Sequence, residues 1–246
     1  NTCVSMERQE IEGRPLELGE LRIKLDQMTE RISSRFKDRS RFPLNEKVYV
    51  PGGVKIDGRP DISYFEFAIE GLERYHATLG RFEDKDQHPV IGLNLPMSSA
   101  ERDVRQTELP EIQVNIKDNL ISFYEELIKK HCTPGDDPLS YGETVYIDAD
   151  LVELINERIN IGRFVAEVKG RSDPSIYSLA TDEEILNKLK DRVREEALIG
   201  KVRSTAETYQ YSPDMAEESF RWMIDRTMDI EIAYIRQARR SQRPIK

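Results

Sequence analysis

Apolar residues recur every three or four positions along most of this chain, which is the spacing of one face of an α-helix. Alternation of the strand type is almost absent. The spacing predicts helices over residues 18–39, 62–79, 112–131, 148–170, 182–198, 201–208 and 213–240. The sequence therefore predicts an all-α fold, a single-domain bundle of several helices that spans residues 1–246.

Three helix ends carry signals of their own. Asp148 precedes an apolar run and is the expected N-cap of its helix. Ser212 followed by Pro213 fits the N-cap and the first turn of the last helix. Gly80 is expected to end the helix over 62–79.

The composition narrows the functional classes. The 246 residues carry a formal net charge of −9, which argues against a general nucleic-acid binder because such proteins need a basic surface. No run approaches the roughly 18 apolar residues of a membrane-spanning helix. The chain begins with Asn1 rather than Met, so we expect that an upstream segment, such as a targeting or secretion segment, was removed or left out. The cytoplasm is the expected compartment.

Neither the cysteines nor the histidines form a metal-binding pattern. Cys3 and Cys132 give no CxxC pair, and free thiols are favoured over one disulfide. His76, His88 and His131 lie near predicted turns or surface segments, and the chain holds no HExxH, GxGxxG, P-loop or GxSxG motif. We therefore expect neither a metal nor a cofactor.

Two cations lie on the apolar face of the helix predicted over 148–170. At about 100° per residue, Arg158 and Lys169 fall near the middle of the apolar stripe, and Gly162 leaves a gap between them. A structural alternative for Arg158 is a buried ion pair with Glu231.

The last predicted helix repeats this pattern with other residues. Thr227 and Glu231, four positions apart, lie in the centre of a stripe that contains Phe220, Met223, Ile224, Ile230, Tyr234 and Ile235. Burial there should raise the pKa of the Glu231 carboxyl, because an apolar environment disfavours the charged form. Thr227 has a structural alternative, a hydrogen bond to a carbonyl of its own helix.

Other charged residues give weaker signals. Asp191 and Glu195, with Arg194 between them, share a helix face that is not the leucine face, so a solvated surface is the alternative. Arg22 lies at the edge of the first stripe, where a surface position is the alternative, and Arg39 lies within the stripe. Cations, a hydroxyl and buried carboxyl groups, without a nucleophile–base pair, suit a pocket for a polyanionic ligand.

Several segments resemble one known family, the all-helical chorismate mutases, in the larger form found in fungi and plants. The segment GRFVAEVKGRSDPSIY resembles the region around the catalytic lysine of this family, and LRIKLDQMTERISSRFKDRSRF resembles its first helix. DRVREE and RTMDIEIAYI resemble its last active-site helices, and LERYHATLGRFEDKDQHP and YGETV resemble its regulatory region. The resemblance covers nearly the whole chain in order.

The resemblance implies a reaction and a set of partners. It implies a homodimeric, cofactor-independent enzyme that converts chorismate to prephenate by a Claisen rearrangement, in aromatic amino-acid biosynthesis. Chorismate is then the small-molecule substrate, and no nucleic acid or membrane is an expected partner.

The resemblance also implies roles for the cations and for the buried carboxyl group. Arg158 and Arg22 look like clamps for the two substrate carboxylates, and Lys169 looks like the donor to the ether oxygen. Glu231, in its protonated form, looks like the second donor. Arg158 takes the place that Arg39 could fill in the small bacterial form, so Arg39 is expected to be structural.

The remaining candidates match the family less evenly. Thr227 looks like a carboxylate contact, and Glu195 looks like the acceptor for the ring hydroxyl. Asp191 falls where the fungal form carries Asn and the small bacterial form carries Asp. Arg194 matches only the bacterial D-x-x-R-E pattern.

The regulatory region departs from the family. The larger form binds tryptophan and tyrosine between subunits, and Arg81 and Gly142 fit the pattern of that site. Gly80, however, stands where the fungal form has a second arginine, and Glu143 stands where a serine is usual. An added carboxylate should repel the carboxylate of an amino acid, so weak allosteric control is expected.

Two other functions remain open at this point. One is another activity on the same scaffold, such as that of an isochorismate pyruvate lyase, which releases pyruvate. The other is a catalytically inactive helical protein that binds a partner.

Overall fold

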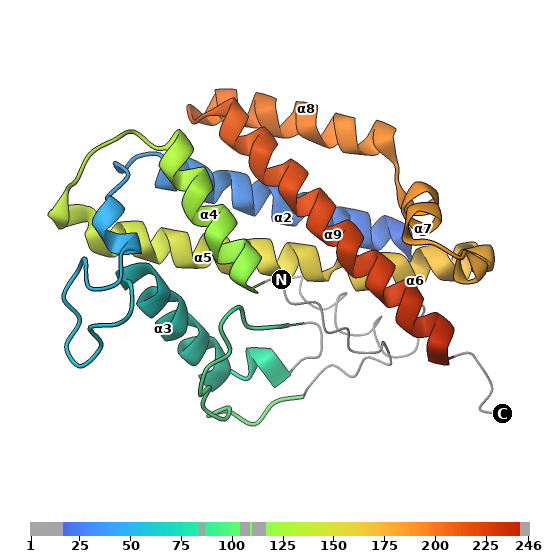
Figure 1. Ribbon diagram of the computed structural model, residues 1–246, viewed down its shortest axis with the longest axis horizontal. Helices are drawn as coiled ribbons and strands as arrows, with labels where there is room; N and C mark the ends of the chain where they lie inside the picture. Colours follow the sequence, from blue (N-terminus) through green and yellow to red (C-terminus); the bar gives the residue numbers. More distant parts are fainter. Residues whose placement is uncertain (1–16, 84–86, 104–108, 110–116, 242–246) are drawn as a thin grey trace, which may run out of the picture.

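The computed structural model describes residues 17–83, 87–103, 109 and 117–241, and all regular structure within these ranges is helical (Figure 1). The α-helices are α2 (Leu18–Arg39), α3 (Tyr64–Thr78), α4 (Lys117–His131), α5 (Tyr141–Asn160), α6 (Gly162–Ser172), α7 (Asp182–Leu189), α8 (Arg192–Tyr209) and α9 (Pro213–Ser241). Short 3₁₀ helices lie at η1 (Glu46–Tyr49), η2 (Arg81–Glu83), η3 (Pro138–Ser140) and η4 (Pro174–Ser178). The all-α prediction is confirmed. No described helix is both long and apolar enough to span a bilayer.

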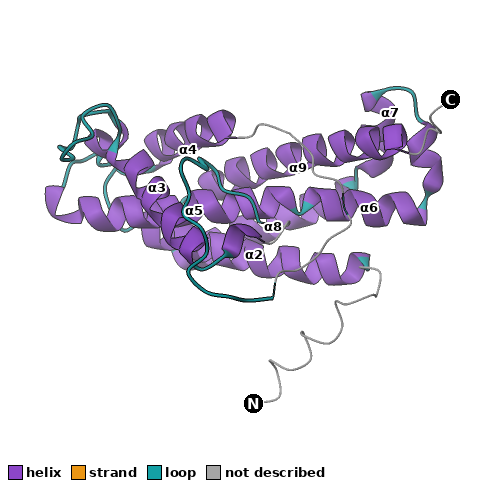
Figure 2. Cartoon of the chain, turned by 90° about the horizontal axis from the view of Figure 1, so that it is seen from below, coloured by secondary structure: helices purple, strands orange, loops and turns teal. Residues whose placement is uncertain are grey.

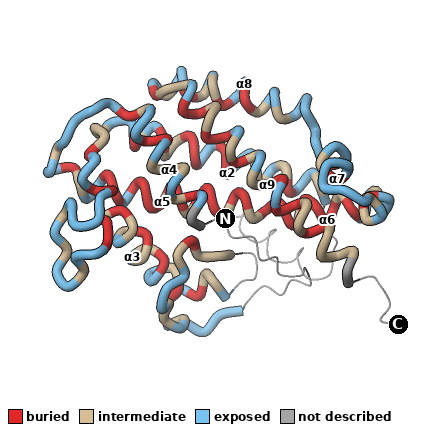
Figure 3. The backbone as a smooth tube through the Cα atoms, viewed as in Figure 1, coloured by how far each residue is buried: buried red, intermediate tan, exposed pale blue. Residues whose placement is uncertain are grey.

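Helices α5 and α6 run in line and form the middle layer of the bundle. Helix α2 packs on one side of this layer and α9 on the other (Figure 2). Helix α8 packs against both α9 and α2. Buried residues concentrate along these packed faces (Figure 3). The main core includes Ile32, Phe36, Phe65, Ile69, Leu120, Tyr124, Leu151, Ile155, Ile159, Phe220 and Met223.

Two of the predicted helix ends are wrong. The helix expected over 148–170 begins at Tyr141, and a turn at Ile161 divides it into α5 and α6. Asp148 is therefore not an N-cap, and it lies fully buried inside α5, where it binds a cation. The break expected near Gly200 lies instead at residues 190–191, because Asp191 caps a new helix there. One glycine costs a helix only about 1 kcal/mol, which packing against α9 offsets.

The other helix ends agree with the expectations. Ser212 accepts a hydrogen bond from the backbone N–H of Met215 (3.2 Å) at the start of α9. Gly80 follows the last turn of α3 with φ +71°, a left-handed conformation that glycine adopts without strain. The helix predicted over 112–131 is α4, and residues 112–116 lie outside the described residues.

A buried polar cluster joins α2, η1, α4 and α5. The five N–H groups of the Arg39 guanidinium donate to the Asp148 carboxylate, the Tyr49 hydroxyl and the carbonyls of Phe42, Pro43 and Leu44. Tyr49 and Tyr124 each donate to the same carboxylate at 2.6 Å. No N–H of Arg39 is left for a ligand, which agrees with its expected structural role.

Helices α6 and α9 approach closely at Gly162. A Cβ atom on Gly162 would lie 2.9 Å from the carbonyl oxygen of Thr227 and 3.0 Å from its methyl carbon. Real Cβ atoms are not found so close to backbone oxygen, so a side chain here would push the two helices apart. The glycine therefore determines how far α6 lies from α9. Lys169 lies on α6 and Glu231 lies on α9, so the same residue also determines how far apart these two side chains are.

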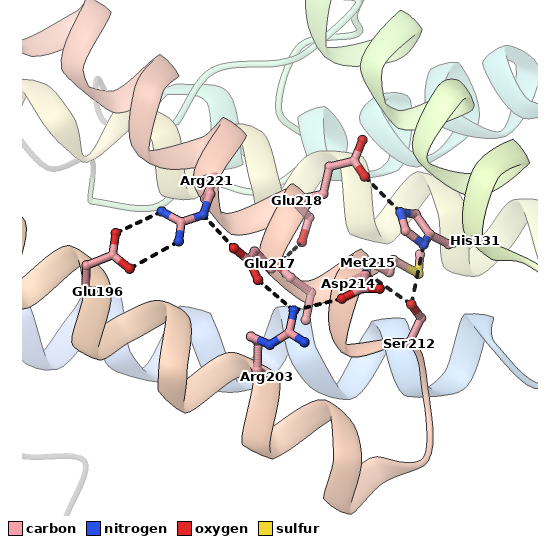
Figure 4. Close-up of polar contacts among 11 residues, drawn as sticks. His131, Glu196, Arg203, Ser212, Asp214, Met215, Glu217, Glu218 and Arg221 are labelled. Atoms are coloured by element: carbon pink, nitrogen blue, oxygen red, sulfur yellow. Dashed lines mark hydrogen bonds and ion pairs between the residues drawn. The ribbon is translucent and has the colours of Figure 1, made fainter.

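Surface charges link α8 to α9 from the connected ends of the two helices to the beginning of α8 (Figure 4). Arg203 contacts Asp214 (2.8 Å) and Glu217 (2.6 Å), and Arg221 contacts Glu196 (3.0 Å) and Glu217 (2.8 Å). Such exposed pairs contribute little individually, but together they fix how α8 lies along α9.

We predict that Asp148→Ala lowers the free energy of unfolding by about 3–5 kcal/mol, because it leaves the buried Arg39 cation without its partner. Asp150→Ala is the matched control, since it removes a partly exposed pair with Arg35 on the same helices and should cost about 1 kcal/mol or less. Urea unfolding at one fixed protein concentration measures both. Equal losses in the two variants would contradict the structural importance of the buried pair.

Candidate active site

A cleft of about 580 Å³ lies where α6, α7 and the beginning of α8 meet. Its lining includes four cations, Lys169, Lys188, Lys190 and Arg192, and two carboxylates, Asp173 and Asp191. The other lining residues are Leu18, Ser172, Ile176, Asn187, Leu189 and Val193. Although the chain is acidic overall, cations outnumber carboxylates in this cleft, which favours an anionic ligand.

Lys169, which lines this cleft, forms an ion pair with Glu231. The Nζ of Lys169 donates to Oε2 of Glu231 (3.0 Å) and to the backbone carbonyl of Leu189 (2.9 Å). The Glu231 side chain is only 2% exposed, whereas that of Lys169 is 24% exposed and lines the cleft. An ammonium has three N–H donors, so one is left for a ligand.

The environment of Glu231 favours its protonated form. Burial and, to a smaller extent, the charge of Glu195 raise the pKa of this carboxyl to about 7, against the opposing charge of Lys169. The Oε1 atom of Glu195 is itself buried, without a hydrogen-bond partner among the described residues. Two carboxyl groups, one on α8 and one on α9, therefore lie near each other, and that of Glu231 can hold a proton near neutral pH.

Arg158 lies buried in the last turn of α5, with 4% of its surface exposed. Its guanidinium carbon lies 5.3 Å from the ring centre of Phe220, and its Nε has no hydrogen-bond partner among the described residues. Burial lowers the pKa of Arg158 to about 10, the charge of Arg194 lowers it too, and Asp26 opposes the shift. The alternative of an Arg158–Glu231 ion pair is wrong, because Glu231 pairs with Lys169.

The remaining candidates lie at the edge of the site or are used by their own helices. Arg22 and Asp191 are half-exposed and lie 3.9 Å apart. Asp191 also caps α8, because it accepts a hydrogen bond from the backbone N–H of Arg194 (3.1 Å). The Thr227 hydroxyl donates to the carbonyl of Met223 (2.7 Å), which is the structural alternative expected for it.

Sequence reasoning missed two contributors to the site. Asp26 follows Arg22 by four positions, a spacing that puts both side chains on one face of α2. This spacing alone indicates that Asp26 lies on the same side of the helix as Arg22, and the structure places its charge near Arg158. The Leu189 carbonyl had no signal in the side-chain pattern. It depends on where α7 ends, and the predicted helix 182–198 ran past that point.

The two candidate regulatory residues do not meet within one chain. Arg81 contacts Glu157 on α5 (3.7 Å) and His76. Gly142 lies in the first turn of the same helix, 15 residues before Glu157, which is about 22 Å at 1.5 Å per residue. A site that used both residues would need a second copy of the chain.

The arrangement matches known proteins over most of its length. The family model of chorismate mutase type II matches residues 141–232, which hold α5 to α8 and most of α9. The chorismate mutase of Schizosaccharomyces pombe is 30% identical over 201 residues, which cover 79% of this chain and 80% of the relative. The chorismate mutase of Trichoderma parareesei is 28% identical over 221 residues, which cover 83% of this chain and 80% of the relative.

The crystal structure of the chloroplast chorismate mutase from Zea mays has the same fold. It superposes with a TM-score of 0.82 at 24% identity, over 94% of this chain and 97% of that one. Given this fold and the extent of the match to the Schizosaccharomyces pombe protein, the chain belongs to the chorismate mutase family.

Proposed function

We propose that this chain catalyses the rearrangement of chorismate to prephenate, on the route to phenylalanine and tyrosine, in the site formed by α2, α5, α6, α8 and α9. The observation that carries the proposal is the Lys169–Glu231 pair. It places the ammonium of Lys169, which lines a cation-rich cleft, beside a carboxyl group with a pKa of about 7. Both groups can donate to one developing negative charge.

The reaction needs no covalent bond to the enzyme. Within one substrate molecule the ether C–O bond breaks while a C–C bond forms, so catalysis consists of holding the compact diaxial conformer and stabilising charge on the ether oxygen. In this proposal Arg158 and Arg22 bind the two substrate carboxylates. The cleft-facing N–H of Lys169 and the proton of Glu231 donate to the ether oxygen.

Other side chains position the substrate in this proposal. Glu195 accepts a hydrogen bond from the ring hydroxyl through its unpartnered oxygen. Thr227 contacts a carboxylate, and it must turn its hydroxyl away from Met223 to donate to it. Asp191 caps α8 at the rim, and Arg194 adds positive charge near Arg158.

We further propose that the chain works as a homodimer, in the cytoplasm. Helix α3 exposes Phe67 and Tyr75, of which Tyr75 is 61% exposed, and Leu79 directly after the helix is exposed as well. Their spacing puts these side chains on one side of the helix. Exposed large apolar side chains on one side of a helix are typical of a subunit interface.

The proposal is tested with the purified full chain and chorismate. Chorismate loss is followed by absorbance, and pyruvate is assayed in the same samples. We expect chorismate consumption without pyruvate. Pyruvate release would indicate a lyase on the same scaffold, and binding of a protein partner without any turnover would indicate an inactive helical protein.

We predict that Lys169→Ala lowers kcat by about 10²–10³-fold, because one donor to the transition state is lost. The free energy of unfolding should change far less, and Lys201→Ala, which removes an exposed cation on α8, should leave kcat unchanged. Arg158→Ala should lower kcat and also raise KM, since this cation binds the ground-state carboxylate. Near-normal turnover in Lys169→Ala would make Lys169 a structural cation.

The pH dependence of kcat/KM should follow Glu231. Its folded pKa of about 7 lies above the ordinary value, so the protonated, donating form is lost as pH rises through 7 and kcat/KM should fall over that range. Glu231→Gln supplies a donor that does not titrate, and it should remove this fall while keeping substantial activity. Glu231→Ala should be poorly active at every pH. A Gln variant as inactive as the Ala variant would exclude Glu231 from the donor role.

Tryptophan and tyrosine should change the initial rate little. Arg81 is engaged with Glu157, and the exposed Glu143 carboxylate would repel an amino-acid carboxylate near Gly142. An arginine at position 80 would not restore a second clamp, because the backbone there has φ +71° and a Cβ would lie 2.8–2.9 Å from neighbouring side chains. Titration of each amino acid decides this, and clear activation by one and inhibition by the other would contradict it.

A further inference from the structure

The Lys169 ammonium is held by acceptors from two other helices. One is the carboxyl group of Glu231 on α9, and the other is the backbone carbonyl of Leu189, the last residue of α7. The two distances, 2.9 Å to the carbonyl and 3.0 Å to the carboxyl, are those of full hydrogen bonds.

The Leu189 carbonyl is available because α7 ends there. Lys190 adopts an extended backbone (φ −70°, ψ 128°), so the chain leaves the helix and the last carbonyls lose their partners within it. The C-terminal end of a helix also carries a partial negative charge, which favours a cation. The end of α7 therefore suits the ammonium of Lys169 both as an acceptor and electrostatically.

The end of α7 is fixed against α6 and α9. The Leu189 side chain is 2% exposed and belongs to an apolar cluster with Ile176, Ile185, Met228, Tyr234 and Ile235. The neighbouring Lys188 forms an ion pair with Asp173 (2.6 Å), the residue that follows α6. The carbonyl is thus attached to packed elements rather than to a free loop.

The two acceptors of Lys169 differ in one chemical respect. In the proposed reaction Glu231 acts as a neutral acid, and a neutral carboxyl group attracts an ammonium less than a carboxylate does. A backbone carbonyl has no such change, because it does not titrate. Two fixed acceptors leave the third N–H of a tetrahedral ammonium with one fixed direction, and the Lys169 side chain lines the cleft.

We propose that Leu189 is a positioning residue, whose carbonyl keeps the Lys169 ammonium oriented toward the ether oxygen while Glu231 is protonated. This inference rests on the proposed function, since it acts through Lys169 in the chorismate reaction. A backbone atom between α7 and α8 would then influence the chemical step, because it orients the ammonium that donates to the substrate.

The test is a double-mutant cycle with a matched control. Leu189→Ala removes the side chain that anchors the carbonyl, and it should lower kcat by about 10–100-fold with little change in KM, because Arg158 and Arg22 still bind the carboxylates. Ile185→Ala removes a similarly buried side chain from the same cluster one turn earlier. It should cost similar stability without this loss of kcat. Leu189→Met, which conserves volume, should restore most of kcat.

The decisive measurement is the effect of Leu189→Ala in the Lys169→Ala background. If Leu189 acts through Lys169, the double variant should have the kcat of Lys169→Ala alone. Additive losses, or an equal kcat loss in Ile185→Ala, would overturn the inference while leaving the proposed function intact. If Leu189→Ala does not fold, the milder Leu189→Val takes its place in the same cycle. A wild-type chain that does not turn over chorismate would overturn both.

Discussion

The buried pair of Arg39 and Asp148 is the interaction on which the arrangement of the bundle depends. Both side chains are fully excluded from water. Two tyrosine hydroxyls and three backbone carbonyls make further hydrogen bonds to the pair, so every N–H of the guanidinium has an acceptor. It fixes α2 against α5. Because a helix is rigid over its length, this contact also determines where Arg22 and Arg158 lie at the other end of the same two helices.

The end of the bundle that holds the proposed active site has the opposite character. Arg158 is almost as buried as Arg39, yet its Nε has no hydrogen-bond partner among the described residues, and its guanidinium lies over the aromatic ring of Phe220. Glu195 has an unpartnered buried oxygen as well. Buried polar atoms without partners reduce stability, and in the proposed reaction the bound substrate supplies the partners that these two side chains lack.

The sequence predicts most of the fold because the apolar stripes are long and regular. The same periodicity indicates that Lys169 and Glu231 both face the interior, and the structure brings them together. The prediction that Asp148 is an N-cap is wrong. An Asp before an apolar run is typical of an N-cap, and nothing near it in the sequence indicates its partner Arg39, which lies 109 residues away. The contribution of the Leu189 carbonyl depends on where α7 ends, and side-chain patterns do not carry that information.

The pairing of Lys169 with Glu231 spans 62 residues of sequence, and this separation has a consequence for how the protein becomes active during synthesis. Helices α2, α3 and α5 can pack against one another while the ribosome is still adding residues, because their contacts do not involve α9. Glu231 belongs to α9, which emerges after α2 to α8, and long-range contacts of this kind form late because the intervening chain must first be ordered. The docking of α9, which packs against α4, α5, α6, α7 and α8, should therefore complete the core and the proposed active site in one step.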